Sequence, residues 1–159
     1  MTSQCWCWST SLNMPRFFTL AQAEKLLPQV EPAVREAIAR KVAYDRAEAE
    51  CRSFSQRLMV TGGMHVDRSR VLEQRGRRDS AALLVKSSID RVLEFGCQIK
   101  DIEIGLIDFP ALFNGEEVCL CWKMGESGIQ FWHGVHEGFR GRKAIDRKFL
   151  EQHQGELPD

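Results

Sequence analysis

Six polar residues in the C-terminal half of the chain are the main candidates for a chemical site: Lys100, Asp101, Asp108, Glu126, His133 and Arg142. Asp108 is the most informative, because aspartate is disfavoured in strands and this one interrupts the apolar run IGLIDFPA. It could be a carboxylate for acid–base chemistry or ligand binding, with His133 or Arg142 completing a pocket. The structural alternative is a carboxylate held by Lys123, Arg142 or backbone amides.

Two basic segments could bind anions. In the segment GFRGRK, exposed backbone amides with Arg140 and Arg142 could hold a phosphate or carboxylate, but the strand-to-helix setting of a phosphate-binding loop is missing. A second basic cluster comprises Arg68, Arg70, Arg75, Arg77 and Arg78. Acidic residues elsewhere offset it, so we expect a solvated helix face and no nucleic-acid partner.

The composition is that of an ordinary globular protein. The chain has 159 residues, with 22 basic and 22 acidic side chains and 43% hydrophobic residues, which suits one domain with a real core. It contains no apolar run of the roughly 20 residues that a membrane span needs and no secretory signal, so we expect a cytoplasmic protein. Residues 1–15 show no periodicity and are interpreted as an irregular appendage to a single domain over residues 16–159.

Residues 19–96 are expected to form a helical hairpin. Thr19 and Gln22 have the spacing of a capping box at a helix start. Pro28 and Pro32 each remove an amide donor, so a break is expected over 27–30, with a new helix from about Glu31 to Leu58. A second helical region covers about 66–95, and Gly96 is its C-terminal cap.

The period changes after Gly96, and three short strands are expected over 104–108, 118–123 and 129–133, forming a β-meander within about 102–134. Asn114-Gly115 predicts a two-residue hairpin that places Phe109 opposite Leu120. A second turn over 125–128 would place Leu120 opposite His133. The apolar face would pack on the hairpin, giving an α+β fold. Residues 135–159 are expected to be a loop and a short helix.

This register opposes a metal site or a Cys–His catalytic pair. Cys119 and Cys121 are expected on one face of the sheet together with Asp108, whereas His133 is expected on the opposite face, so the cysteines and His133 could not bind one ion. We therefore expect no metal and no cofactor. Cys5 and Cys7 form a C-x-C pair in the N-terminal appendage, for which a redox or metal role is the less favoured alternative.

Three blocks carry a resemblance to a known family: FTLAQAEKLLPQVEP, GCQIKDIEIGLIDFPA, and LCWKMGESGIQFWHG followed by GFRGR. Together they resemble an uncharacterised bacterial family, the domain of unknown function numbered 2203, over about 17–142. The six candidate site residues and Cys121 all match its pattern, whereas residues 1–14 and Cys119 do not. The resemblance implies a small bacterial cytoplasmic protein with a helical hairpin and a β-meander, and it carries no activity.

Two functions remain. The first is a non-enzymatic interaction or self-assembly module, because the long helices expose more apolar stripe than one small sheet can cover. Its partner would be a second copy of the chain or another protein. The second is a binding protein or enzyme for a small anionic ligand, with its site near Asp108, His133 and Arg142. The sequence favours the first.

Overall fold

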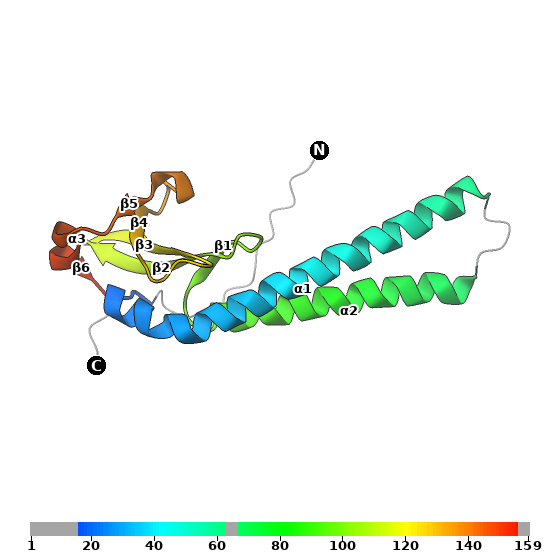
Figure 1. The fold of residues 1–159 in the computed structure, drawn as a ribbon, viewed down its shortest axis with the longest axis horizontal. Helices are drawn as coiled ribbons and strands as arrows, with labels where there is room; N and C mark the ends of the chain where they lie inside the picture. The colour runs from blue at the N-terminus through cyan, green and yellow to red at the C-terminus, as the bar shows by residue number, and fades with distance from the viewer. Residues whose placement is uncertain (1–15, 63–66, 156–159) are drawn as a thin grey trace.

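The computed structural model describes residues 16–62 and 67–155, which form a long antiparallel pair of helices with a small sheet packed at one end (Figure 1). Helix α1 spans Leu20–Val60 and α2 spans Arg68–Leu93. The predicted α+β class with a helical hairpin is confirmed. We term residues 16–39 and 87–155 the head, and residues 40–62 and 67–86 the distal arm. The appendage predicted for residues 1–15 lies outside the described residues.

Helix α1 begins at the predicted cap but is not broken by its prolines. The Thr19 hydroxyl accepts from the Gln22 amide at 3.2 Å, and the Thr19 amide donates to Gln22 Oε1 at 2.8 Å. The predicted break over 27–30 is wrong, because the helix continues through Pro28 and Pro32. A proline has no N–H to donate to the carbonyl oxygen four residues before it. Both prolines are exposed, so water can bind these two carbonyl oxygens instead. Burial of the opposite face against the sheet offsets the cost of about 3 kcal/mol per proline.

The sheet has six strands, so the predicted three-stranded meander is too small. The strands are β1 (Gln98–Asp101), β2 (Leu106–Phe113), β3 (Glu116–Lys123), β4 (Phe131–Gly134), β5 (Lys143–Ala144) and β6 (His153–Gln154). They lie in the order β1-β2-β3-β4-β5, and β6 pairs with the end of β2. The strands β5 and β6 have two residues each, too few to show any periodicity in the sequence.

The first hairpin has the predicted register. Phe113 lies opposite Glu116, Phe109 opposite Leu120 and Ile107 opposite Trp122. The turn residues explain why, since Asn114 has φ 53° and Gly115 has φ 79°. Two positive φ values at the centre of a two-residue loop are the type I′ geometry that Asn-Gly favours.

The second hairpin is shifted by one residue from the prediction. His133 lies opposite Cys119 and Trp132 opposite Leu120, where His133 had been expected opposite Leu120. Since side chains alternate along a strand, this shift moves every side chain of β4 to the other face. His133 therefore joins the cysteines on the face away from the helices, and Trp132 joins the helix-facing side, stacked on Phe149 with ring centroids 4.8 Å apart.

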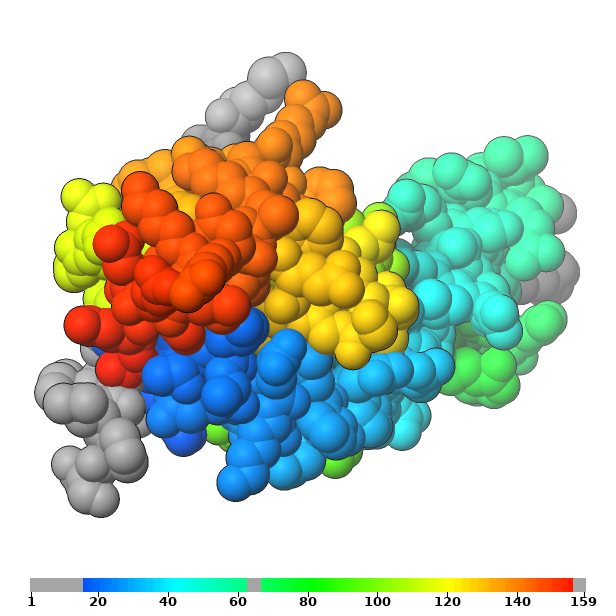
Figure 2. Space-filling view, turned by 60° about the vertical axis from the view of Figure 1, so that its left-hand side comes forward, coloured from blue at the N-terminus to red at the C-terminus, as the bar shows by residue number. Residues whose placement is uncertain are grey.

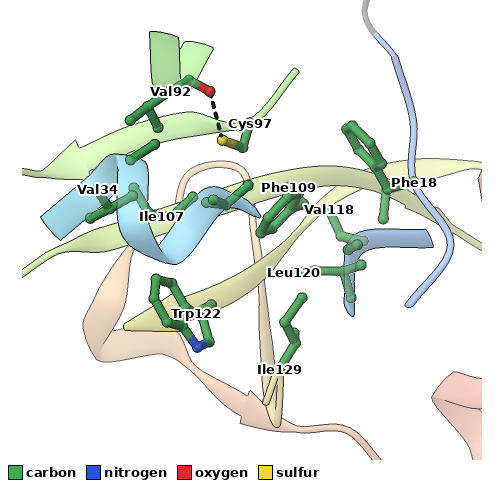
Figure 3. Close-up of a cluster of buried hydrophobic side chains, with 14 of the residues drawn as sticks. Phe18, Val34, Val92, Cys97, Ile107, Phe109, Val118, Leu120, Trp122 and Ile129 are labelled. Carbon is green, nitrogen blue, oxygen red and sulfur yellow. Dashed lines mark hydrogen bonds between the residues drawn. The ribbon is translucent and has the colours of Figure 1, made fainter. Parts of the chain in front are cut away.

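The core lies between the sheet and the first turns of α1. Its buried side chains come from both helices and from β2 and β3: Phe18, Val30, Val34, Val92, Ile107, Phe109, Leu120, Trp122 and Ile129 (Figure 3). Ile129 reaches this core from the loop before β4. In the same core, the Cys97 thiol donates to the Val92 carbonyl oxygen at 3.3 Å. The predicted packing of the sheet's apolar face on the hairpin is confirmed.

The C-terminal segment folds back along the sheet. A 3-10 turn, η1 (Phe139–Gly141), contacts β4 on the side away from the helices (Figure 1), and a short helix, α3 (Arg147–Gln152), places Phe149 in the core. The short helix expected in this segment is therefore present, bounded by β5 and β6. Among the described helices, none is long and apolar enough to cross a membrane.

Gly105→Ala should destabilise the protein by about 2–4 kcal/mol. Gly105 has φ 64°, and an added Cβ would lie 2.6 Å from Met124 Cβ and 3.2 Å from Ile38 Cδ1. Ile38 Cδ1 can rotate away, but Met124 Cβ is fixed to the backbone directly after β3 and cannot move without shifting it. Gly125→Ala is the matched control, since its φ is 96° but nothing lies within 4 Å of an added Cβ. Urea melts of both variants measure the difference, and equal losses would contradict the proposed steric contact.

Candidate functional site

The face of the sheet away from the helices buries three side chains of different chemistry. Asp108 on β2, Cys121 on β3 and His133 on β4 have exposed fractions of 0%, 0% and 2%. One carboxylate oxygen, the thiol sulfur and one imidazole nitrogen all lie within 4.8 Å of one another. Asp108 lies directly opposite Cys121, and neighbouring strands bring His133 beside them.

The proton positions on His133 follow from its contacts. Nδ1 lies 2.8 Å from the carbonyl oxygen of Gly134. A carbonyl oxygen only accepts hydrogen bonds, so Nδ1 must carry a proton. The other nitrogen, Nε2, lies 3.0 Å from Asp108 Oδ2. The pair has the separation of a hydrogen bond but not its angle, and neither carboxylate oxygen of Asp108 makes a hydrogen bond of good geometry.

Two buried thiols border this carboxylate. Cys119 lies two residues before Cys121 and points to the same face. Burial first, and then the negative charge of Asp108, raise the pKa of each thiol to about 12. Both are therefore protonated thiols at neutral pH, and reactive thiolates require the opposite environment.

Glu126 and Arg142 form a separate ion pair at the turn before β4. Arg142 donates two hydrogen bonds of 2.8 Å to the Glu126 carboxylate and a longer one of 3.3 Å to the Cys121 carbonyl oxygen. Glu126 also accepts from the Lys123 amide at 2.8 Å. Partial burial raises the pKa of Glu126, but the bonds from Arg142 and Lys123 outweigh it, so the net pKa is lowered. This pair holds the turn together.

The remaining two candidates do not join either group closely. Lys100 bonds to Gln98 at 2.9 Å, and its Nζ lies 3.9 Å from Asp108 Oδ2, too far for a hydrogen bond. Asp101 is exposed at the end of β1, where its carboxylate accepts from the Glu103 amide at 2.9 Å and closes the turn to β2. Of the six predicted residues, the structure therefore brings Asp108 and His133 together, with Lys100 at the margin.

Cys121 is the residue of this site that the sequence interpretation did not assign. The pattern had correctly placed Asp108, Cys119 and Cys121 on one face of β2 and β3. His133 was assigned to the wrong face because of the one-residue shift in β4. With His133 on the opposite face, there was no reason to group it with Asp108, Cys119 and Cys121. The geometric objection to a shared site therefore does not hold.

Comparison with curated proteins and with solved structures gives no match. A family described as "Uncharacterized conserved protein (DUF2203)" matches residues 16–145, which include both helices, strands β1 to β5 and all six candidate site residues. This match covers most of the chain and agrees with the resemblance that the sequence blocks indicated. The chain therefore belongs to the DUF2203 family.

Proposed function

We propose that the protein is a self-assembly module in which the distal arms of two copies pair side by side in opposite directions. The arm extends well away from the head, so most of its surface has no covering element within the chain (Figures 1 and 2). Among the described residues of the arm, only Cys51 is a buried hydrophobic side chain. An extended arm with almost no core of its own is therefore the first observation that supports self-assembly.

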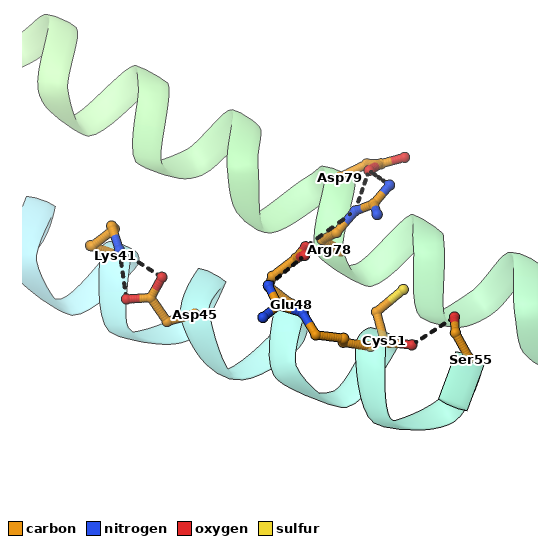
Figure 4. A network of polar contacts seen from close by, with 8 residues as sticks. Lys41, Asp45, Glu48, Cys51, Ser55, Arg78 and Asp79 are labelled. Atoms are coloured by element: carbon orange, nitrogen blue, oxygen red, sulfur yellow. Dashed lines mark hydrogen bonds and ion pairs between the residues drawn. The ribbon is translucent and has the colours of Figure 1, made fainter. Parts of the chain in front are cut away.

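Large apolar side chains lie exposed along this arm. Their exposed fractions range from 47% to 87%, for Val42, Met59, Val60, Leu72, Leu83 and Leu84. An ion pair of Arg78 with Glu48 at 3.8 Å also joins the two helices of the arm (Figure 4). Exposed ion pairs contribute little stability. A partner that covers the apolar side chains would stabilise the arm more than its own ion pairs do.

The charge distribution favours a second copy as that partner. Residues 40–86 carry eleven basic and six acidic side chains, whereas the rest of the chain carries eleven basic and sixteen acidic. The arm is therefore net positive and the remainder net negative. When two arms pair in opposite directions, the tip of each basic arm comes next to the acidic head of the other copy. A two-fold axis closes this arrangement as a dimer.

Sedimentation velocity on the full chain tests the proposal. We expect a dimer at micromolar concentration in about 0.05 M salt, weakening in about 0.5 M salt because the charges become screened. Leu72→Asp should raise the dimer dissociation constant at least about tenfold. The matched control is Leu150→Asp on α3, which changes an exposed leucine in the head. A chain that stays monomeric up to about 100 μM at low salt would overturn the proposal. This holds equally if the monomer binds an oligonucleotide through its basic arm.

The alternative, a site for an anionic ligand formed by Asp108, His133 and Arg142, has less support. The Arg142 guanidinium is already paired with Glu126 through two short hydrogen bonds. Asp108 would repel an anion placed beside it. What remains of this alternative is the buried contact of Asp108 with His133, whose chemistry differs from that of an anion site.

A further inference from the structure

We propose that Asp108, Cys121 and His133 bind a divalent metal ion of the zinc type. Carboxylate oxygen, thiolate sulfur and imidazole nitrogen are all zinc ligands, and the presence of both a thiolate and an imidazole favours zinc or cobalt over magnesium or calcium. The three side chains come from three adjacent strands, which hold their positions rigidly. No part of this inference depends on the pairing of the arms.

The tautomer of His133 is the one that a metal ligand needs. Its Nδ1 proton is held by the Gly134 carbonyl oxygen at 2.8 Å, which leaves the lone pair on Nε2. A backbone carbonyl on the far nitrogen is a common way of orienting a metal-bound histidine. Without a cation or an additional proton, this lone pair would lie 3.0 Å from a carboxylate oxygen, and the two would repel each other.

The Asp108 carboxylate provides the second, independent observation. It is fully buried, and neither of its oxygens makes a hydrogen bond of good geometry, since the two neighbouring thiols offer only weak S–H contacts. Leaving a buried charge without partners is costly. Two atoms that bind one tetrahedral zinc ion at about 2.0–2.2 Å lie roughly 3.3–3.5 Å apart. The Nε2–Oδ2 separation of 3.0 Å is only slightly shorter, and the poor hydrogen-bond angle is expected if both lone pairs point toward a third atom.

A nucleophilic thiol site explains the same residues less well. In a cysteine–histidine pair, the histidine accepts the thiol proton at one nitrogen, while a third group orients it at the other. Here the carboxylate, not the thiol, is the group in close contact with Nε2, and a backbone carbonyl occupies Nδ1. Both thiols have a pKa of about 12, which is unsuited to a nucleophile. Convergence of all three groups on one point matches metal coordination.

Cys119 is the nearest thiol for a fourth position. It lies opposite His133 on the neighbouring strand and faces the same side as Cys121. Its burial leaves little room for bulk solvent around the site. A tetrahedral set of two thiolates, one imidazole and one carboxylate is a closed arrangement, which is typical of structural zinc sites. Binding would release the thiol protons to solvent.

The test is reconstitution of the chelator-stripped full chain with Zn²⁺ or Co²⁺ alone. We expect about one ion per chain, with a dissociation constant below about 1 μM. The Co²⁺ form should show a thiolate-to-metal charge-transfer band and the visible bands of a four-coordinate ion. Cys121→Ser, His133→Ala and Asp108→Asn should each weaken binding at least about tenfold, and Cys121→Ser should diminish the thiolate band.

Two controls separate this site from the other thiols. Cys97→Ser changes a buried cysteine on the helix-facing side of the sheet and should leave binding unchanged. Cys5→Ser combined with Cys7→Ser removes the N-terminal C-x-C pair and should also leave it unchanged. Cys119→Ser should weaken binding if this thiol is the fourth ligand, and an unchanged value would assign that position to water while keeping the three-residue site.

Three outcomes would overturn the proposal. The first is a stripped wild-type chain that takes up neither ion at about 100 μM. The second is a bound ion that is lost with Cys5 and Cys7 but retained by the Cys121→Ser and His133→Ala variants. The third is a Co²⁺ form of the wild type without a thiolate band. Since the first and third outcomes concern the wild-type chain, a variant that fails to fold does not remove the test.

Discussion

Trp122→Ala should lower the free energy of unfolding by about 3–5 kcal/mol, the usual cost of removing a large buried aromatic side chain. Trp122 is 1% exposed and packs with Val34, Leu120 and Ile129 in the core (Figure 3). Its Nε1 also donates to the Glu126 carbonyl oxygen at 3.1 Å, so the indole ties the turn before β4 to the core. Urea denaturation followed by circular dichroism gives the loss directly.

Two variants separate the contributions to this loss. Trp122→Phe keeps most of the apolar surface but removes the hydrogen bond, and should cost less than Trp122→Ala. Trp132→Ala removes an indole that is only partly buried, although it faces the same side of the sheet and contacts the Phe113 ring at a tilt with centroids 5.0 Å apart. It should also cost less. A loss for Trp132→Ala as large as that for Trp122→Ala would contradict the observed difference in burial.

His133→Ala should destabilise the protein by about 3–5 kcal/mol when measured with a chelator present, so that no metal contributes. Without metal, an additional proton between Nε2 and Asp108 Oδ2, 3.0 Å apart, makes this contact favourable. The substitution removes the contact and leaves the buried carboxylate beside the Cys121 thiol, with the Lys100 ammonium 3.9 Å away. A buried charge that loses its partner is among the most costly single changes. Thermal and urea melts of the stripped protein provide the measurement.

The matched control is His136→Ala, which removes an exposed imidazole three residues away and should change stability by less than about 0.5 kcal/mol. Adding Asp108→Asn to His133→Ala should recover part of the loss, because the amide carries no charge to leave unpaired. An effect of His133→Ala as small as that of His136→Ala would show that the buried contact contributes nothing to stability.

Local signals in the sequence were reliable where one short motif determines the backbone. The Thr19–Gln22 capping box marked the start of α1 because its two hydrogen bonds span only three residues. Asn114-Gly115 determined the register of β2 and β3 because both residues adopt the positive φ that a two-residue loop needs. That register correctly grouped Asp108 with Cys119 and Cys121.

The failures occur where distant parts of the chain compete with local preference. The prolines of α1 do not break it, because Val30 and Val34 are buried against the sheet on its other side. Strands β5 and β6 exist because the C-terminal segment lies beside β4 and β2. No pattern in two residues could predict such a pairing.

The sequence by itself determined the α+β class, the helical hairpin, the first β-hairpin and the family. The tertiary structure decided which face His133 occupies. The turn before β4 has no two-residue motif that sets its length. Two long-range contacts set it instead: Ile129 enters the core, and Glu126 pairs with Arg142 sixteen residues later. A strand alternates with a period of two, so a one-residue difference in that turn moves His133 from one face to the other. The buried group of Asp108, Cys121 and His133 exists only because of that difference.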